Sequence, residues 1–186
     1  MIRSFLLEMV GYCLISLPFY MVIRMLYMRK QNKNWPREIV MMLFFLYCVS
    51  IFSQTIIPNF YINEGRIIFD TSNAFIRSNF TPLTTIHLYY DQLDGPIAQI
   101  AFYNLVGNIV LFIPFGFFIP LLWKKLRSWW KMHIIAFAIP LFIECTQYFI
   151  GRSIDVDDVL LNAIAIVLGF VMYKVLHRLR KFVIDK

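Results

Sequence analysis

Five long apolar segments decide what this chain can fold into. They lie at about residues 5–28, 39–57, 97–123, 132–150 and 159–176. Each is close to or above the roughly 20 residues that a helix needs to cross the apolar core of a bilayer. Of the 186 residues, 60% are hydrophobic, whereas soluble domains typically have roughly 45–50%. The sequence therefore predicts an all-α polytopic membrane protein with about five transmembrane helices.

The basic residues predict how these helices are oriented. Most of the 18 lysines and arginines lie within residues 24–37, 124–131 and 174–186, which alternate with segments that contain most of the acidic residues. Because short cytoplasmic loops are enriched in Lys and Arg, we expect the N-terminus outside and the C-terminus in the cytoplasm. The net charge is +7, and the basic residues flank the apolar segments at one membrane face, where they would meet anionic lipid head groups. We therefore expect no nucleic-acid partner.

Residues 58–96 form a connection that is too long for a simple loop and too aromatic for a disordered linker. The stretch RIIFD at residues 66–70 favours a short strand, and residues 84–93 favour a short helix. We therefore expect a structured extracytoplasmic loop between the second and third transmembrane helices.

The third apolar segment combines amides with helix-disturbing residues. Asn104 and Asn108 are four residues apart and share one helical face, with Phe112 one turn further. Pro114 removes a backbone donor and Gly116 loosens the next turn, which predicts a kink or a local unwinding of this helix.

Polar side chains are also concentrated where the fourth apolar segment ends and the fifth begins. An ionisable side chain at membrane depth costs about 2.5–3.5 kcal/mol on the more modest scales, so such groups usually face a protein interior or a wet cavity. With the two asparagines of the third segment, we expect one functional cluster near the outer half of the helix bundle. It comprises Asn104, Asn108, Glu144, Gln147, Arg152, Asp155, Asp157, Asp158 and Asn162.

A purely structural interpretation of these residues stays open at this point. In it, Arg152 neutralises Glu144 or an aspartate, and Asp155 caps the helix of the fifth segment. Ala165 and Gly169 continue the face of Asp158 with small residues, which favours close packing against another helix or a second copy of the chain.

The cluster offers oxygen ligands but no histidine, and its acidic residues lack a recognisable metal spacing. We expect no cofactor. A divalent cation at Asp155, Asp157 and Asp158, with Glu144 nearby, remains open because Mg²⁺ and Ca²⁺ prefer oxygen ligands.

Three sequence blocks resemble those of the VanZ-like family, which is named for a teicoplanin-resistance protein. They read NFTPLTT at 79–85, NLVGNIVLFIPFGF at 104–117 and ECTQYFIGRSIDVDDVLLN at 144–162. The resemblance covers about residues 45–175 and implies a single integral membrane domain over residues 1–186. Besides the polar cluster, the positions that match the family are Asn79, Pro82, Gly107, Phe112, Pro114 and Gly116. The chain departs from the family at Ala163 and Ala165, where Thr and Gly are more frequent.

The resemblance implies a small multi-pass protein of the bacterial cytoplasmic membrane, in a family with some members linked to lower susceptibility to lipid-tailed glycopeptides. The leading hypothesis is an envelope protein, not an enzyme, that reduces access or binding of teicoplanin-type antibiotics at the outer membrane face. Its partners would be membrane lipids and either the lipoglycopeptide or an envelope lipid or polymer, and it could form a homo-oligomer.

Two alternatives come from other classes of protein. The first is a membrane enzyme that acts on a lipid-linked phosphate or cell-wall precursor, with Glu144 as general base, Arg152 holding the phosphate and Asp158 in the site. The second is a small transporter that uses the intramembrane Glu144.

Overall fold

The computed structural model describes residues 2–28, 34–56, 60–63, 66–69, 78–96, 98–150 and 152–184. Within these ranges, five helices are long and apolar enough to cross a membrane. They are α1 (Ile2–Met28), α2 (Trp35–Thr55), α4 (Ala98–Leu122), α5 (Trp129–Phe149) and α6 (Val156–Ile184). Each overlaps one of the five predicted segments, which confirms a multi-pass membrane protein built from helices.

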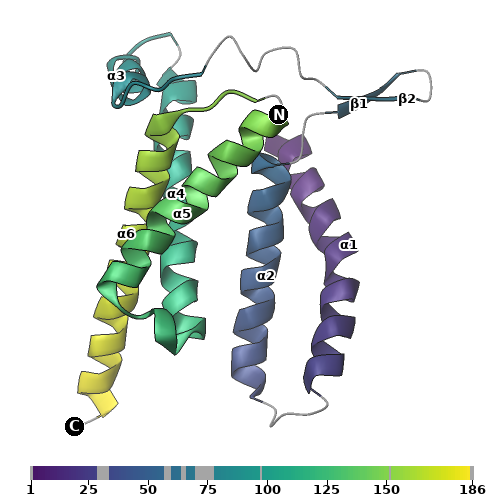
Figure 1. The fold of residues 1–186 in the computed structure, drawn as a ribbon, viewed down its shortest axis with the longest axis vertical. Helices are drawn as coiled ribbons and strands as arrows, with labels where there is room; N and C mark the ends of the chain where they lie inside the picture. The colour runs from purple at the N-terminus through teal and green to yellow at the C-terminus, as the bar shows by residue number, and fades with distance from the viewer. Residues whose placement is uncertain are drawn as a thin grey trace. The chain divides into compact units, whose positions relative to one another are not determined.

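The chain divides into two compact units, Met1–Ile57 and Pro58–Lys186. The single domain expected from the sequence stays a prediction. In the first unit, α1 and α2 run in opposite directions side by side (Figure 1). The rings of Tyr20 and Phe45 stack with centroids 4.6 Å apart, and Arg24 Nη2 donates to Glu38 Oε1 over 2.7 Å. The ion pair satisfies both charges within the helix pair.

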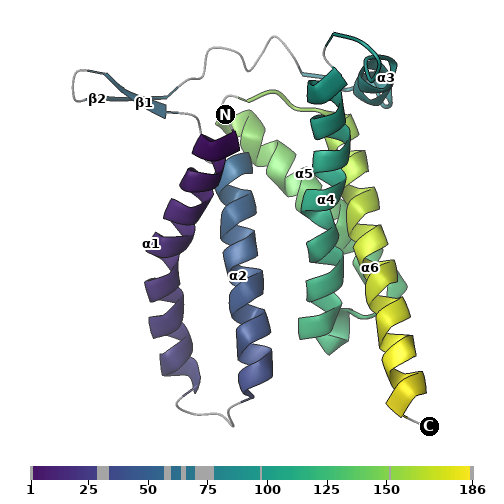
Figure 2. The ribbon, with the colours of Figure 1, turned by 180° about the vertical axis from the view of Figure 1, so that it is seen from behind.

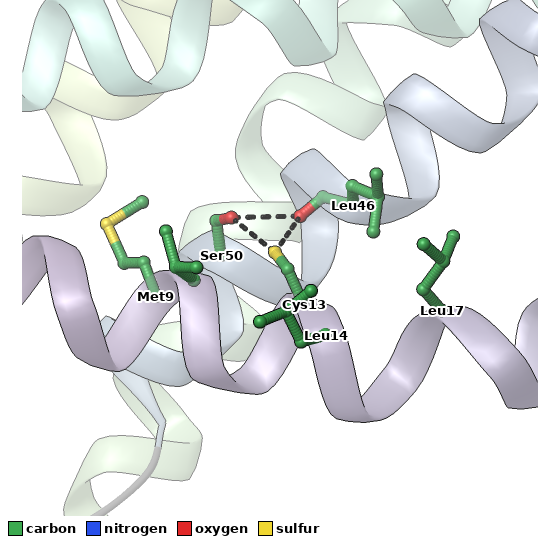
Figure 3. A pocket seen from close by; sticks show the side chains of 7 residues that line it. Met9, Cys13, Leu14, Leu17, Leu46 and Ser50 are labelled. Atoms are coloured by element: carbon green, nitrogen blue, oxygen red, sulfur yellow. Dashed lines mark hydrogen bonds between the residues drawn. The ribbon is translucent and has the colours of Figure 1, made fainter.

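A hollow of about 280 Å³ lies on this helix pair. Figure 3 shows Met9, Leu14, Leu17 and Leu46 around it, with Cys13 and Ser50 as its polar members. The Cys13 thiol contacts Ser50 Oγ at 3.3 Å, and the Ser50 hydroxyl donates to the Leu46 carbonyl oxygen of its own helix. These polar groups satisfy one another, so the hollow is an apolar packing feature without charged side chains.

In the second unit, α6 packs against both α4 and α5 (Figures 1 and 2). Buried side chains recur every three or four residues on each helix, as one face of a helix requires. The largest fully buried side chains are Phe112 on α4, Met132 on α5 and Phe170 on α6. Large apolar residues such as Phe137 and Phe142 point outward. An apolar exterior of this kind suits helices surrounded by lipid.

Two glycines bring the backbones of α4 and α6 into direct contact. A Cβ atom on Gly116 would lie 1.8 Å from the carbonyl oxygen of Ile166, and one on Gly169 would lie 2.0 Å from that of Ile113. This is the close approach that small residues permit between membrane helices. The predicted small-residue face of Ala165 and Gly169 therefore packs inside the chain, and Ala165 is fully buried. It is not exposed for contact with a second copy.

The predicted local unwinding of the third apolar segment is wrong, because α4 is helical throughout Ala98–Leu122 with Pro114 and Pro120 inside it. Its contact with α6 holds this stretch of backbone in place, and membrane helices tolerate proline where neighbouring groups compensate for the missing bond. A kink without unwinding stays a prediction.

The connection between α2 and α4 contains regular structure, as expected. Strand β1 (Phe60–Asn63) pairs antiparallel with β2 (Arg66–Phe69), and helix α3 (Thr84–Asp91) follows. The strand predicted at residues 66–70 is present except for Asp70, which lies outside the described residues. The helix predicted at 84–93 is two residues shorter than expected. A short 3₁₀ helix, η1 (Lys124–Leu126), joins α4 to α5.

Replacing Gly116 with Ala should destabilise the α4–α6 contact. We expect the free energy of unfolding in detergent to fall by about 1–3 kcal/mol, because the new methyl group overpacks the interface. Thermal unfolding of the purified protein measures this. The matched control is Gly107→Ala on the same helix, where nothing lies within 4 Å of the added Cβ and alanine favours the helix. Equal stability of the two variants would contradict the inferred contact.

Candidate functional site

Asp157 connects the start of α6 to the start of α3. Its side chain is fully buried. Its Oδ1 accepts the backbone N–H of Leu83, and its Oδ2 accepts those of Thr85 at 2.7 Å and Ile86 at 3.1 Å. The first N–H groups of a helix have no partner within the helix and favour a negative charge beside them. Asp157 therefore fixes α3 to α6.

Asn79 and Asp155 make a second connection between the same two segments. The backbone N–H of Asn79 donates to the Ile154 carbonyl oxygen over 2.8 Å, and the N–H of Val156 donates to the Asn79 carbonyl oxygen over 3.1 Å. The Asn79 amide also donates to Asp155 Oδ1 and to Thr85 Oγ1, each at 3.1 Å. We call Asn79, Thr85, Asp155 and Asp157 the loop clamp.

The structure confirms that Asp155 caps α6. Its Oδ1 accepts the backbone N–H of Asp157 at 2.9 Å, which satisfies a donor of the first helical turn. Its own backbone N–H donates to Glu144 Oε2 of α5 over 3.0 Å. Glu144 therefore ties the end of α5 to the beginning of α6 across the turn between them.

A second set of polar residues belongs to α4, α5 and α6, and it is joined to the loop clamp by the bond from the Asp155 N–H to Glu144. Asn108 on α4 donates through Nδ2 to Asp158 Oδ1 on α6 over 2.9 Å. Asn162 is one turn further along α6 and only 5% exposed, and its Oδ1 has no hydrogen-bond partner among the described residues. Glu144 and Asn162 are buried, whereas Asp158 and Asn108 are partly buried. We call these four residues the buried polar group.

The electrostatic surroundings of Glu144 join the two sets. It is 4% exposed and lies within electrostatic range of Asp155, Asp158 and Arg152. Three carboxyl groups and a guanidinium are therefore close together at this end of the apolar helices, where charge interactions are stronger than in water. This arrangement can bind a polar group by hydrogen bonds and charge.

Other predicted residues lie outside these contacts or act through the backbone. The Asn104 amide donates to the Ile100 carbonyl oxygen of its own helix. The backbone N–H of Arg152 donates to the Gln147 carbonyl oxygen over 2.9 Å, at the end of α5. A Cβ atom added to Gly107 would meet nothing within 4 Å. Pro82 is exposed in the turn before α3.

The arrangement gives the cation hypothesis no support. Within the described residues, no three His, Cys, Asp or Glu side chains are grouped so that they could hold a metal ion. The oxygens of Asp157 already accept three backbone N–H groups, so this side chain is committed to the loop.

Sequence reasoning missed the backbone donors of Leu83, Thr85 and Ile86. Leu83 has a φ of 69°, in the left-handed region that residues other than glycine rarely adopt. This conformation follows Pro82 and turns the chain into α3. The resemblance of the NFTPLTT block to the family indicated that this segment matters, but it did not indicate that the backbone N–H groups of this segment bond to Asp157.

Apolar helices that enclose carboxylates and amides at one end define a multi-pass membrane protein with a polar site inside its bundle. Comparison with protein families identifies the family. Residues 40–177 match the model of VanZ/LLP1, so the chain belongs to the VanZ/LLP1 family. The match confirms the resemblance stated from the sequence and includes both the loop clamp and the buried polar group. No curated protein and no solved structure matches the chain.

Replacing Asp157 with Asn should loosen the start of α3 while the bundle stays folded. The amide side chain lacks the charge and one acceptor, so we expect the N–H groups of Thr85 and Ile86 to exchange with solvent at least about tenfold faster. Hydrogen–deuterium exchange of the purified protein measures this. Asp158→Asn is the matched control, because Asp158 contacts Asn108 and not the loop. Equal acceleration in both variants would contradict the loop clamp.

Proposed function

We propose that this VanZ-like protein lowers the access or binding of lipid-tailed glycopeptide antibiotics at the outer face of the bacterial cytoplasmic membrane. The observation that carries the proposal is the buried polar group at one end of the bundle of α4, α5 and α6. Carboxylates and amides inside apolar helices are costly and usually functional. In this proposal the buried polar group is the functional site, and no chemical change of the antibiotic is required.

Charge asymmetry supports the outward location. The carboxylates lie at the beginning of α6, whereas Lys174, Arg178 and Arg180 lie towards its end. Lys124, Lys125 and Arg127 follow α4, whose end lies beside α6 away from the acidic turn (Figure 2). Since basic residues favour the cytoplasmic side, the acidic end faces outward in this proposal.

The physical basis of selectivity is the lipid tail. An acyl chain partitions into the bilayer with about 0.8 kcal/mol per buried CH₂ group, which brings teicoplanin to the membrane surface where the loop clamp and the buried polar group would lie. Vancomycin has no such tail and depends less on this surface. A protein that occupies or modifies the surface therefore affects teicoplanin more.

Cells that express the wild-type protein should bind less fluorescent teicoplanin than cells without it, with little change for vancomycin. At matched membrane abundance, Glu144→Gln and Asp158→Asn should restore teicoplanin binding, because each replaces a carboxyl group of the buried polar group with an amide. The control is Asp94→Asn, which changes an exposed aspartate outside both polar sets. Cell-associated fluorescence is the measurement.

Two results would count against this function. Equal effects on both antibiotics would remove the role of the lipid tail, and no effect of the wild-type protein would remove the role in resistance. In the second case, analysis of lipid-linked cell-wall precursors in the same strains tests the enzyme alternative. That alternative draws on the closeness of Arg152 to Glu144, because a guanidinium beside a carboxylate can hold a phosphate next to a base.

The orientation has its own test. In a background with Cys13, Cys48 and Cys145 replaced by Ser, a membrane-impermeant maleimide should label Ser153→Cys in intact cells. It should label Lys124→Cys only after the membrane is permeabilised. Both positions are exposed, so the difference reports the side of the membrane. The reverse pattern would contradict the outward location of the acidic end.

A further inference from the structure

Several basic residues lie at the end of α4 and on the adjacent part of α6. Residues 95–143 and 159–184 contain no Asp or Glu. The described part of α6 and the α4–α5 connection place Lys124, Lys125, Arg127 and Lys174 in this region. Positive charge there has no acidic counterpart on these segments, so an external anion is the complementary partner.

Arg127 is fixed in place by two contacts. Its Nε donates to the Pro120 carbonyl oxygen over 2.9 Å, which satisfies one of the free carbonyl groups at the end of α4. Its guanidinium lies over the ring of Tyr173 on α6, 5.5 Å from the ring centroid. The remaining guanidinium N–H groups have no acceptor among the described residues. A held guanidinium with free donors is suited to phosphate recognition.

An aromatic ladder on α6 supports a second cation. The rings of Phe170 and Tyr173 are stacked with centroids 6.3 Å apart, and His177 stacks on Tyr173 at 5.6 Å. Lys174 Nζ lies 5.1 Å from the centroid of the Phe170 ring. Arg127 and Lys174 are therefore placed over adjacent rings. Tyr173 is only 3% exposed, and its hydroxyl has no hydrogen-bond partner among the described residues.

Exposed indole rings indicate the depth of this region in the membrane. Trp123, Trp129 and Trp130 are exposed around the α4–α5 connection, and tryptophan is enriched where the hydrocarbon core meets the lipid head groups. The Trp129 ring also contacts Phe170 edge to face at 4.9 Å. Arg127 and Lys174 therefore lie near the level at which lipid phosphates are found.

We propose that Arg127 and Lys174, held against the rings of Tyr173 and Phe170, bind the phosphate of an anionic phospholipid head group. This site is separate from the buried polar group and independent of the proposed function. The fixed guanidinium supplies hydrogen bonds with defined direction, and the ammonium supplies a second charge. Anionic lipid is the expected occupant because its phosphate is present at this depth and matches the unbalanced positive charge.

Native mass spectrometry of the full chain, titrated with phosphatidylglycerol or phosphatidylcholine in detergent micelles, tests the site. We expect tighter binding of phosphatidylglycerol. Arg127→Gln and Lys174→Gln should each weaken it by about tenfold, the loss expected for one charge-assisted hydrogen bond. Arg127→Lys should give a smaller loss, since it keeps the charge but not the planar fork.

The matched control is Arg180→Gln, which removes an exposed positive charge from α6 outside the aromatic ladder. It should weaken phosphatidylglycerol binding by less than about twofold if screened surface charge is all that is lost. Equal losses in Arg127→Gln and Arg180→Gln would overturn the specific site, as would equal affinity for the two lipids. Competition by soluble glycerol phosphate at the same concentrations would instead assign the site to a free phosphate and overturn the lipid as its ligand. Because Arg127 also caps α4, Lys174→Gln decides the question if Arg127→Gln does not fold.

Discussion

The contact between Gly116 of α4 and Gly169 of α6 is the constraint on which the second unit depends. Each glycine lies against the backbone of the other helix, at distances that any side chain would prevent. This approach sets the register of the two helices, because a Cβ on either glycine would force them apart. The register in turn places Asn108 opposite Asp158, where the two side chains form a hydrogen bond.

The polar cluster contains two kinds of residue that look alike in the sequence. Asp155 and Asp157 have their oxygens engaged by backbone N–H groups and the Asn79 amide, so they hold the loop before α4 against α6. Glu144 and Asp158 contact groups of α6 and α4, and Asn162 keeps an acceptor without a partner in the described part of the chain. Carboxylates that are close together in the sequence therefore make different contacts, and each substitution has to be interpreted according to its set.

The sequence was sufficient for the membrane fold and only partly sufficient for the site. Apolar segments near 20 residues predicted the five spanning helices because length and composition are local properties. The cap at Asp155 was also predictable, since a cap acts within its own helix. The backbone conformation at Pro114 was not predictable in this way, because α4 stays helical at Pro114 in contact with α6. The role of Asn104 stays a prediction, and its amide donates to the Ile100 carbonyl oxygen of its own helix.

By itself, then, the sequence determined the number of spans, the separation of acidic from basic ends, and the family, all of which follow from residue type and order along the chain. The tertiary structure decided which polar groups meet. The bond between Asp157 and the Leu83 N–H joins residues 74 positions apart, and the cation–π contact of Arg127 with Tyr173 joins a connection to a different helix. Neither pairing has a local signal, because each depends on how the helices pack and on backbone groups that every residue carries.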